Sequence, residues 1–265
     1  MSSNLPLPLD IRLMNLTASA LITALLLAGI GAGLWWVLRH PVFAISQITV
    51  TGDTQHHTAA SLRAEVATQL SGNFFTLDLN KTRAAFEHVP WVRRAMVRRE
   101  FPGRLTVDLQ EHVPVARWGD DETRLVNRQG EVFEVGGLDA DQAGLPLLLG
   151  PDGQAADLLE RLGAFSRLLQ PLQSHISVLE LQLRGHWHLE LDSGVEVELG
   201  QGGAPELARR LGQFAATAAE VAGRHGRTVT DIEEVDLRHV DGYALRLRGV
   251  VTGEQAADSR ARAGR

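Results

Sequence analysis

Apolar residues are concentrated in one uninterrupted run near the N-terminus. The run extends from Leu13 to Leu38 and contains no Asp, Glu, Lys, Arg or His. As a helix it would be about 39 Å long, at about 1.5 Å per residue. A bilayer core about 30 Å thick needs about 20 apolar residues. The pattern therefore predicts one transmembrane helix, residues 13–38, followed by a soluble part that contains no second run of this kind.

A cleaved signal peptide is the main alternative for this run. Its apolar region would be about 7–15 residues long and would end in small residues. Here the run is longer and ends in bulky residues, among them Trp35 and Trp36, which suit the aromatic belt at a membrane surface. Arg12 and Arg39 flank the two ends, so the positive-inside rule does not decide the orientation. We favour an uncleaved anchor with residues 1–12 as a cytoplasmic tail.

Gly29 and Gly33 give the run a GxxxG spacing. This spacing can let two membrane helices approach closely. Glycine is common in membrane helices in any case, so a helix that does not self-associate is the favoured interpretation and pairing stays open. The residues expected to define the anchor are Leu13, Gly29, Gly33, Trp35, Trp36 and Leu38.

The next segment, residues 43–113, has the pattern of a strand, two helices and two strands. Strands are predicted over 45–51, 91–99 and 105–111, the last with strict alternation of apolar and polar residues. A first helix is predicted over 58–70, with Thr58 as its N-cap, and a second after Asp78. The inner faces of the helices are expected to be Leu62, Val66 and Leu70 in the first, and Leu79, Arg83, Phe86 and Val89 in the second.

Residues 114–250 predict a second domain, with a mixed or antiparallel sheet and flanking helices. Strands are predicted over 124–126, 131–135, 145–149, 178–184, 187–191, 195–199, 232–238 and 243–248, and helices over 157–169 and 205–223. Residues 251–265 are rich in Ala, Gly and Arg and predict a flexible tail. The predicted fold class is α+β.

Motifs that carry chemistry are scarce. The sequence has no cysteine, no GxSxG elbow, no Walker A loop and no HExxH helix. His186 and His188 would share one face of a strand, but two ligands alone do not make a metal site. A net charge of −6 argues against nucleic acid as the main partner. We therefore expect no enzyme activity, no catalytic residue, no metal, no cofactor and no small-molecule substrate.

Arginines gather in the predicted strand pair of the first domain, at Arg93, Arg94, Arg98, Arg99 and Arg104. Near a membrane they could attract anionic headgroups, at about 1 kcal/mol each. A solvated strand face is an equally good interpretation, and both stay open.

Short motifs in a fixed order resemble a known family. They are Val50-Thr51-Gly52, Asn73-Phe74-Phe75, Pro90-Trp91-Val92, Phe101-Pro102-Gly103-Arg104-Leu105, Glu111 to Trp118 and Leu125 to Phe133. Together with the single anchor upstream, they resemble the FtsQ/DivIB family of bacterial cell-division proteins. The resemblance implies a POTRA domain at 43–113 and a β domain at 114–250. It also implies a scaffold of the divisome at the septum, with a single pass through the inner membrane.

The resemblance also implies partners. In the family, the distal part of the β domain binds FtsB, which joins FtsL, and the FtsB segment adds to the last strand. The matching residues here are Tyr243, Ala244, Leu245, Arg246 and Leu247, with Arg238 and Arg184 as basic neighbours. FtsK, FtsW, FtsI and FtsN are expected to contact the POTRA and transmembrane region.

Residue patterns alone leave the last strand open to two interpretations. A sheet edge can pair with another chain, or it can be guarded by charges such as Arg246. Two other protein classes are also considered. A POTRA adaptor of a secretion or outer-membrane assembly system would carry a barrel or repeated POTRA units, for which the chain has no room. A cell-wall hydrolase would need an acid, base or metal constellation that the sequence does not show.

Overall fold

The computed structural model describes residues 9–53, 56, 60, 62, 64, 66, 72–239 and 242–249, with only the backbone of residues 9–12. The chain divides into two compact units, Met1–Glu111 and His112–Arg265. The predicted N-cap Thr58, the inner residue Leu70, the start of the N-terminal tail and the tail 251–265 lie outside the described residues.

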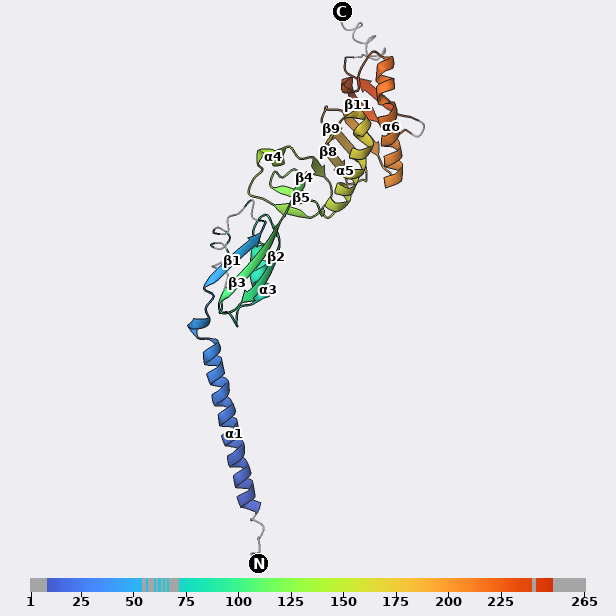
Figure 1. Cartoon of the computed structure of the whole chain (residues 1–265). Helices are drawn as coiled ribbons and strands as arrows, with labels where there is room; N and C mark the ends of the chain where they lie inside the picture. Colours follow the sequence, from blue (N-terminus) through green and yellow to red (C-terminus); the bar gives the residue numbers. More distant parts are fainter. Residues whose placement is uncertain are drawn as a thin grey trace, which may run out of the picture. The chain divides into compact units, whose positions relative to one another are not determined.

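Helix α1 (Leu9–Leu38) contains the whole predicted membrane run (Figure 1). Among the described residues it is the one helix long and apolar enough to cross a membrane, judged by length and composition. In this helix the hydroxyls of Thr17 and Thr23 donate to backbone carbonyls one turn earlier, at 3.0 and 2.8 Å, which reduces their polarity towards lipid. An added Cβ at Gly29 or Gly33 would meet nothing within 4 Å.

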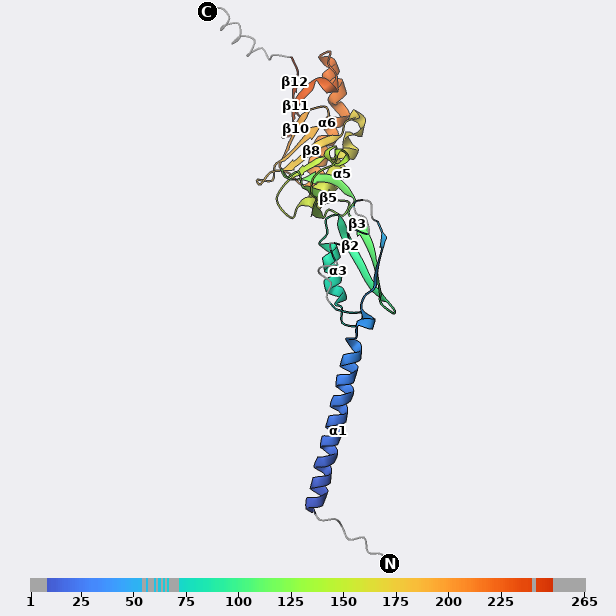
Figure 2. The ribbon, with the colours of Figure 1, turned by 90° about the vertical axis from the view of Figure 1, so that its left-hand side faces the viewer.

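The rest of the first unit is a three-stranded sheet with the order β1-β3-β2. β1 (Gln47–Gly52) runs parallel to β3 (Arg104–Glu111), which is antiparallel to β2 (Val92–Glu100). Helix α3 (Leu79–Glu87) packs on the sheet (Figure 2). The core consists of Leu62, Val66, Leu77, Ala85, Phe86, Val89, Val92, Ala95, Leu105, Val107 and Leu109. The predicted strands, the buried Leu62 and Val66 and the cap Asp78 are confirmed, the last by its side chain accepting from the backbone of Asn80 and Lys81.

One predicted inner residue of α3 is wrong. Arg83 is exposed and lies 3.8 Å from Glu87 as an ion pair one turn away. Thr82 is buried instead, and its hydroxyl donates to the Asp78 carbonyl at 2.9 Å. A threonine with its hydroxyl satisfied inside the helix can face a core, whereas an arginine would need a buried partner.

The second unit contains a nine-stranded sheet with the order β12-β11-β10-β9-β8-β7-β4-β5-β6. Its strands are β4 (Pro114–Trp118), β5 (Arg124–Asn127), β6 (Val132–Glu134), β7 (Leu147–Leu149), β8 (Ile176–Leu181), β9 (Trp187–Leu191), β10 (Glu196–Gly200), β11 (Ile232–Asp236) and β12 (Ala244–Leu247). Three neighbouring pairs are parallel, namely β4 with β7, β7 with β8 and β10 with β11, and the others are antiparallel. The predicted mixed sheet is thus confirmed.

Two long helices cover one face of this sheet (Figure 1). They are α5 (Ala155–Leu169) and α6 (Ala204–Arg224), and α6 provides the crossover between parallel strands β10 and β11. Their buried side chains, such as Leu158, Phe165 and Phe214, join one core with the inner face of the sheet. Short helices α4 (Ala140–Ala143), η1 (Pro41–Phe43), η2 (Gln170–Leu172) and η3 (Val229–Asp231) complete the described fold. The sheet order places β12 at one end.

Candidate partner-binding edge

Strand β12 forms one end of the large sheet, beyond β11 and β10 (Figure 2). Among the described residues it pairs with β11, in antiparallel direction, with Asp236 opposite Ala244, Val235 opposite Leu245 and Glu234 opposite Arg246. An edge strand directs half of its backbone N–H and C=O groups away from its neighbour. Within the part of the chain that the structure describes, the other side of β12 has no neighbouring strand, and we call it the free side.

The direction of each backbone group follows from two hydrogen bonds. The Arg248 N–H donates to the Asp231 carbonyl at 2.8 Å, so Arg248 faces β11. Successive residues of a strand face opposite sides, so Arg246 and Ala244 also face β11, while Leu245 and Leu247 direct their N–H and C=O to the free side. The Leu237 N–H donates to the carbonyl of Glu198 in β10, so Leu237 faces β10. By the same alternation Asp236 and Glu234 direct their backbone groups to β12, which agrees with the pairing above.

Side chains on β12 alternate between the core and the open face of the sheet. Leu245 and Leu247 are half-buried against the core that α6 covers, as is the preceding Tyr243. Ala244 and Arg246 are exposed on the opposite face. The apolar side chains therefore hold the strand in place, and its free backbone groups remain available.

Tyr243 connects the start of β12 to helix α6. Its hydroxyl lies 2.6 Å from the Thr217 hydroxyl, and its ring meets Phe214 edge-on, with centroids 5.6 Å apart. The Thr217 hydroxyl also donates to the Gln213 carbonyl at 2.8 Å. Because a hydroxyl has one hydrogen, Tyr243 is the donor in the shared bond. The helix thus fixes the first residue of the candidate edge.

Arg246 is engaged on the open face by two carboxylates of β11. Its guanidinium lies 3.3 Å from Glu233 and 3.1 Å from Glu234. The side chain is 59% exposed, so these ion pairs contribute little to stability. A partner with an acidic side chain can therefore compete for Arg246.

Arg238 is held beside the edge by Asp236. The Arg238 guanidinium donates to both carboxylate oxygens, at 2.9 and 2.6 Å. These hydrogen bonds, helped by the backbone N–H and the positive charge of Arg238, lower the pKa of Asp236 to about 2, although partial burial opposes the shift. Gly200 lies against the Arg238 stem, since an added Cβ would come within 2.7 Å of Cγ.

Arg184 lies in the exposed turn between β8 and β9. The strand directions put this turn, Gly200, Arg238 and the start of β12 at the same end of the sheet. The Gln201 side chain donates to the Arg184 carbonyl at 2.7 Å and thereby connects the turn to the end of β10. The structure therefore brings Arg184, Arg238 and β12 together along one rim.

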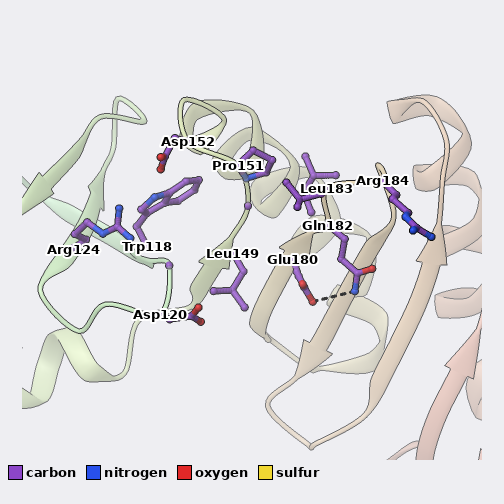
Figure 3. Close-up of a pocket in the computed structure, with 13 residues that line it drawn as sticks. Trp118, Asp120, Arg124, Leu149, Pro151, Asp152, Glu180, Gln182, Leu183 and Arg184 are labelled. Atoms are coloured by element: carbon purple, nitrogen blue, oxygen red, sulfur yellow. Dashed lines mark hydrogen bonds between the residues drawn. The ribbon is translucent and has the colours of Figure 1, made fainter.

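A groove of about 730 Å³ lies on the other side of the Arg184 turn (Figure 3). Trp118, Arg124, Leu149 and Glu180 come from four neighbouring strands and line it, and Arg184 points away from Trp118. Leu183 at its margin is 92% exposed. No sequence pattern predicts this groove, because its walls come from segments far apart in the chain.

One of the two histidines considered as metal ligands, His188, pairs with a carboxylate. His188 lies 3.0 Å from the Glu198 carboxylate on the neighbouring strand, as a cross-strand pair. Within the part of the chain that the structure describes, no group of three or more His, Cys, Asp or Glu residues is placed to hold a metal ion.

Sequence reasoning missed the residues that support the edge. Thr217 and Phe214 on α6 fix Tyr243, and Asp236 fixes Arg238. For Asp236 a signal existed, because an Asp two residues before an Arg can accept from its backbone N–H and its guanidinium together, as it does here. For Thr217 none existed, because the contact depends on how α6 packs.

Comparisons with known proteins agree with this architecture. Residues 116–238 match the family described as "Cell division protein FtsQ/DivIB, C-terminal", and residues 43–112 match "POTRA domain, FtsQ-type". The chain is 40% identical to "Cell division protein FtsQ" of Burkholderia pseudomallei, over 91% of this chain and 94% of the relative. For the proteins of the same name from Bordetella pertussis and Neisseria meningitidis serogroup B, identity is 36% and 30%, over 90% and 84% of this chain and 92% and 89% of theirs.

A POTRA domain behind one apolar helix, followed by a mixed sheet, defines a membrane-anchored protein of bacterial cell division. The chain belongs to the FtsQ/DivIB family. This family assignment implies partners among the divisome proteins. It confirms the resemblance that the short motifs indicated.

Proposed function

We propose that the chain is a non-enzymatic scaffold of the divisome, which connects early and late division proteins. Residues 1–12 lie in the cytoplasm, residues 13–38 span the inner membrane once, and the POTRA domain (43–113) and β domain (114–250) lie in the periplasm at the septum. The family assignment and the single apolar helix support this proposal. Arg12 and Arg39 flank both ends of the membrane span, so charge does not decide its orientation. A reporter that is active only in the periplasm, fused after Arg265, tests the proposed orientation.

The β domain binds the FtsB–FtsL pair by addition of an FtsB strand to β12. The observation that carries this proposal is the free side of β12, to which Leu245 and Leu247 direct their backbone groups. Arg184, Arg238 and Arg246 lie on the same rim or strand and supply positive charge for an acidic partner segment. FtsK, FtsW, FtsI and FtsN contact the POTRA domain and the transmembrane region.

The test compares backbone and side-chain changes at one position. A fragment of residues 42–265 is titrated with an FtsB-derived peptide. Leu245→Pro removes an N–H on the free side, a position that sheet edges tolerate, and is expected to abolish binding. Leu245→Ala keeps that N–H and is expected to weaken binding far less, because strand addition takes its affinity from backbone bonds.

A matched control is placed at the other end of the same sheet. Val132→Pro changes β6, which is the other end strand of the described sheet and pairs with β5, and should leave peptide binding unchanged. Circular dichroism and thermal unfolding verify that each variant is folded. Full binding by a folded Leu245→Pro variant would refute strand addition at β12, whatever the role of the anchor.

A POTRA adaptor of a secretion or outer-membrane assembly system is the second candidate. Such an adaptor would share a POTRA domain with this chain, but the match at residues 43–112 is to the FtsQ-type POTRA family, and the match at 116–238 is to the division family as well. A pull-down from cells with the full chain as bait separates the two, since division proteins are expected and barrel-assembly proteins are not.

A further inference from the structure

Three segments of the first unit meet at the end of its sheet that is next to α1. They are η1 (Pro41–Phe43), the loop 73–76 and the turn 100–104 between β2 and β3. The Phe74 N–H donates to the Phe43 carbonyl at 2.8 Å, and the Ser46 N–H donates to the Gly103 carbonyl at 2.9 Å. These bonds connect parts of the chain that are about 30 to 60 residues apart. The three segments therefore form one continuous surface, which we call the tip.

Aromatic rings fill this tip. Phe43 meets Phe75 with centroids 5.0 Å apart, Phe75 meets Phe74 at 5.2 Å, and Phe74 meets Phe101 at 6.0 Å. The rings are not withdrawn into a core, since Phe101 is 75% exposed, Phe75 44% and the neighbouring Val42 73%. In the described part of the first unit, outside α1, Met96 is the one other large hydrophobic residue with such exposure. The apolar exposure is therefore concentrated at one place.

The tip is attached to the end of the membrane helix. The Asn73 side-chain amide donates to the carbonyl of Leu38, the last residue of α1, while the Asn73 carboxamide oxygen accepts from the N–H groups of Phe75 and Thr76. Phe43 follows Leu38 by five residues, so even an extended chain keeps it within about 18 Å of the helix end. The exposed rings thus lie close to the level at which α1 leaves the bilayer.

Charges around the tip suit a headgroup region. Arg39 stacks over Trp35 at 4.4 Å, and Trp36 meets His40 edge-on at 5.3 Å, just before η1 in the chain. Arg104 and Arg99 are exposed next to Phe101; Glu100 lies 3.8 Å from Arg104, and Arg99 donates to the Leu77 carbonyl. Aromatic rings together with basic side chains are the composition that membrane interfaces select.

We propose that the exposed side chains of this tip, Val42, Phe75 and Phe101, insert into the bilayer interface around the end of α1. The ligand is the lipid surface itself, with apolar rings among the upper acyl chains and Arg39, Arg99 and Arg104 at the headgroups. The POTRA domain is then held by two attachments, the helix and the tip, which fix its orientation to the membrane. This inference is independent of the FtsB–FtsL proposal and holds for either orientation of the anchor.

The absence of cysteine from all 265 residues makes a site-specific test simple. Phe101→Cys in the full chain is labelled with an environment-sensitive fluorophore and reconstituted into vesicles of phosphatidylethanolamine and phosphatidylglycerol. Met96→Cys and Leu183→Cys are the matched controls, because both side chains are exposed and apolar, at 63% and 92%. Met96 lies five residues up β2, about 16 Å from Phe101.

The label at position 101 is expected to shift to the blue and to be quenched several-fold more by lipid-borne quenchers than the label at 96 or 183. Phe75→Ser should reduce that quenching, and Met96→Ser should not. Equal water exposure at 101 and 183 would overturn the proposal. So would quenching at 101 that depends on anionic lipid without a blue shift, since that result assigns the contact to the arginines alone.

Discussion

The hydroxyl of Tyr243 lies 2.6 Å from the hydroxyl of Thr217, which joins the chain just before β12 to the middle of helix α6. Among the described strands β12 has β11 as its neighbour, so this contact and the Phe214 ring add to the support that Leu245 and Leu247 take from the core. The order of the candidate binding edge therefore depends on a helix that comes before it in the chain.

Removal of this hydroxyl should loosen β12 without unfolding the β domain. We expect Tyr243→Phe to cost about 1 kcal/mol, as for a typical hydrogen bond, and to increase hydrogen exchange in β12 more than in β9. Thr217→Val should have a similar effect, and the double variant should be less than additive because both remove one bond. Additive costs in the cycle would show that the two hydroxyls do not interact.

Proline should distinguish the two sides of β12 in stability as well as in binding. Arg246→Pro removes an N–H that faces β11, whereas Leu245→Pro removes one on the free side. In urea unfolding of the fragment 42–265, we expect the free energy of unfolding to fall more for Arg246→Pro, by about 1–3 kcal/mol for a lost bond with a partner left unpaired. The reverse order would mean that the register of the two strands is shifted by one residue.

The Asp236–Arg238 pair should make the stability of the β domain depend on acid pH. Hydrogen bonds from Arg238 lower the folded-state pKa of Asp236 to about 2, below its usual value of 3.8. The stabilisation is therefore complete above about pH 4 and is lost as the pH falls towards 2. Its size is about 1 kcal/mol or less, because Arg238 is 54% exposed and solvent screens the pair. The difference in unfolding free energy between wild type and Asp236→Asn should shrink from pH 6 to pH 2. A constant difference would show that the Asp236–Arg238 pair does not stabilise the folded domain.

Gly200 and Gly226 offer a matched comparison. Both have positive φ, at 75° and 67°, but an added Cβ would approach the Arg238 stem to 2.7 Å at Gly200 and meet nothing within 4 Å at Gly226. Alanine at either site costs about 1–2 kcal/mol for the left-handed backbone. Gly200→Ala should cost a further 1–3 kcal/mol or so for the collision and should displace Arg238 from Asp236. Equal melting temperatures for the two variants would show that Arg238 moves aside freely.

Local pattern sufficed for most helices and strands. Leu158, Leu162, Phe165 and Leu169 are all buried as their spacing predicts, because an amphipathic helix has one apolar stripe to cover. The same rule failed at Arg83, where a neighbouring threonine could satisfy its own hydroxyl and an arginine could not. Strand ends were less predictable, and β8 ends at Leu181 because the chain turns at Gly185, with φ 79°.

Sheet order could not be derived from periodicity. Alternation predicts that β7, β8 and β11 are strands, but it does not say that β4, β7 and β8 run parallel. The position of β12 at the end of the sheet, and the gathering of Arg184 with Arg238, depend on this order. Family resemblance therefore predicted the residues of the candidate edge, whereas the residues of α6 that support it depend on how the helix packs.

β12 also comes late in synthesis. A ribosome must translate past Leu247 before the edge strand exists, and by then β11 and the crossover helix α6 have already been made. A fragment ending near Arg238 lacks Tyr243, Leu245 and Leu247, which pack against the core, and it exposes the backbone of β11, including the half-buried Asp236, as an unguarded template for aggregation. Only molecules that contain β12 would offer the proposed docking edge, so partner binding would select against copies truncated before it.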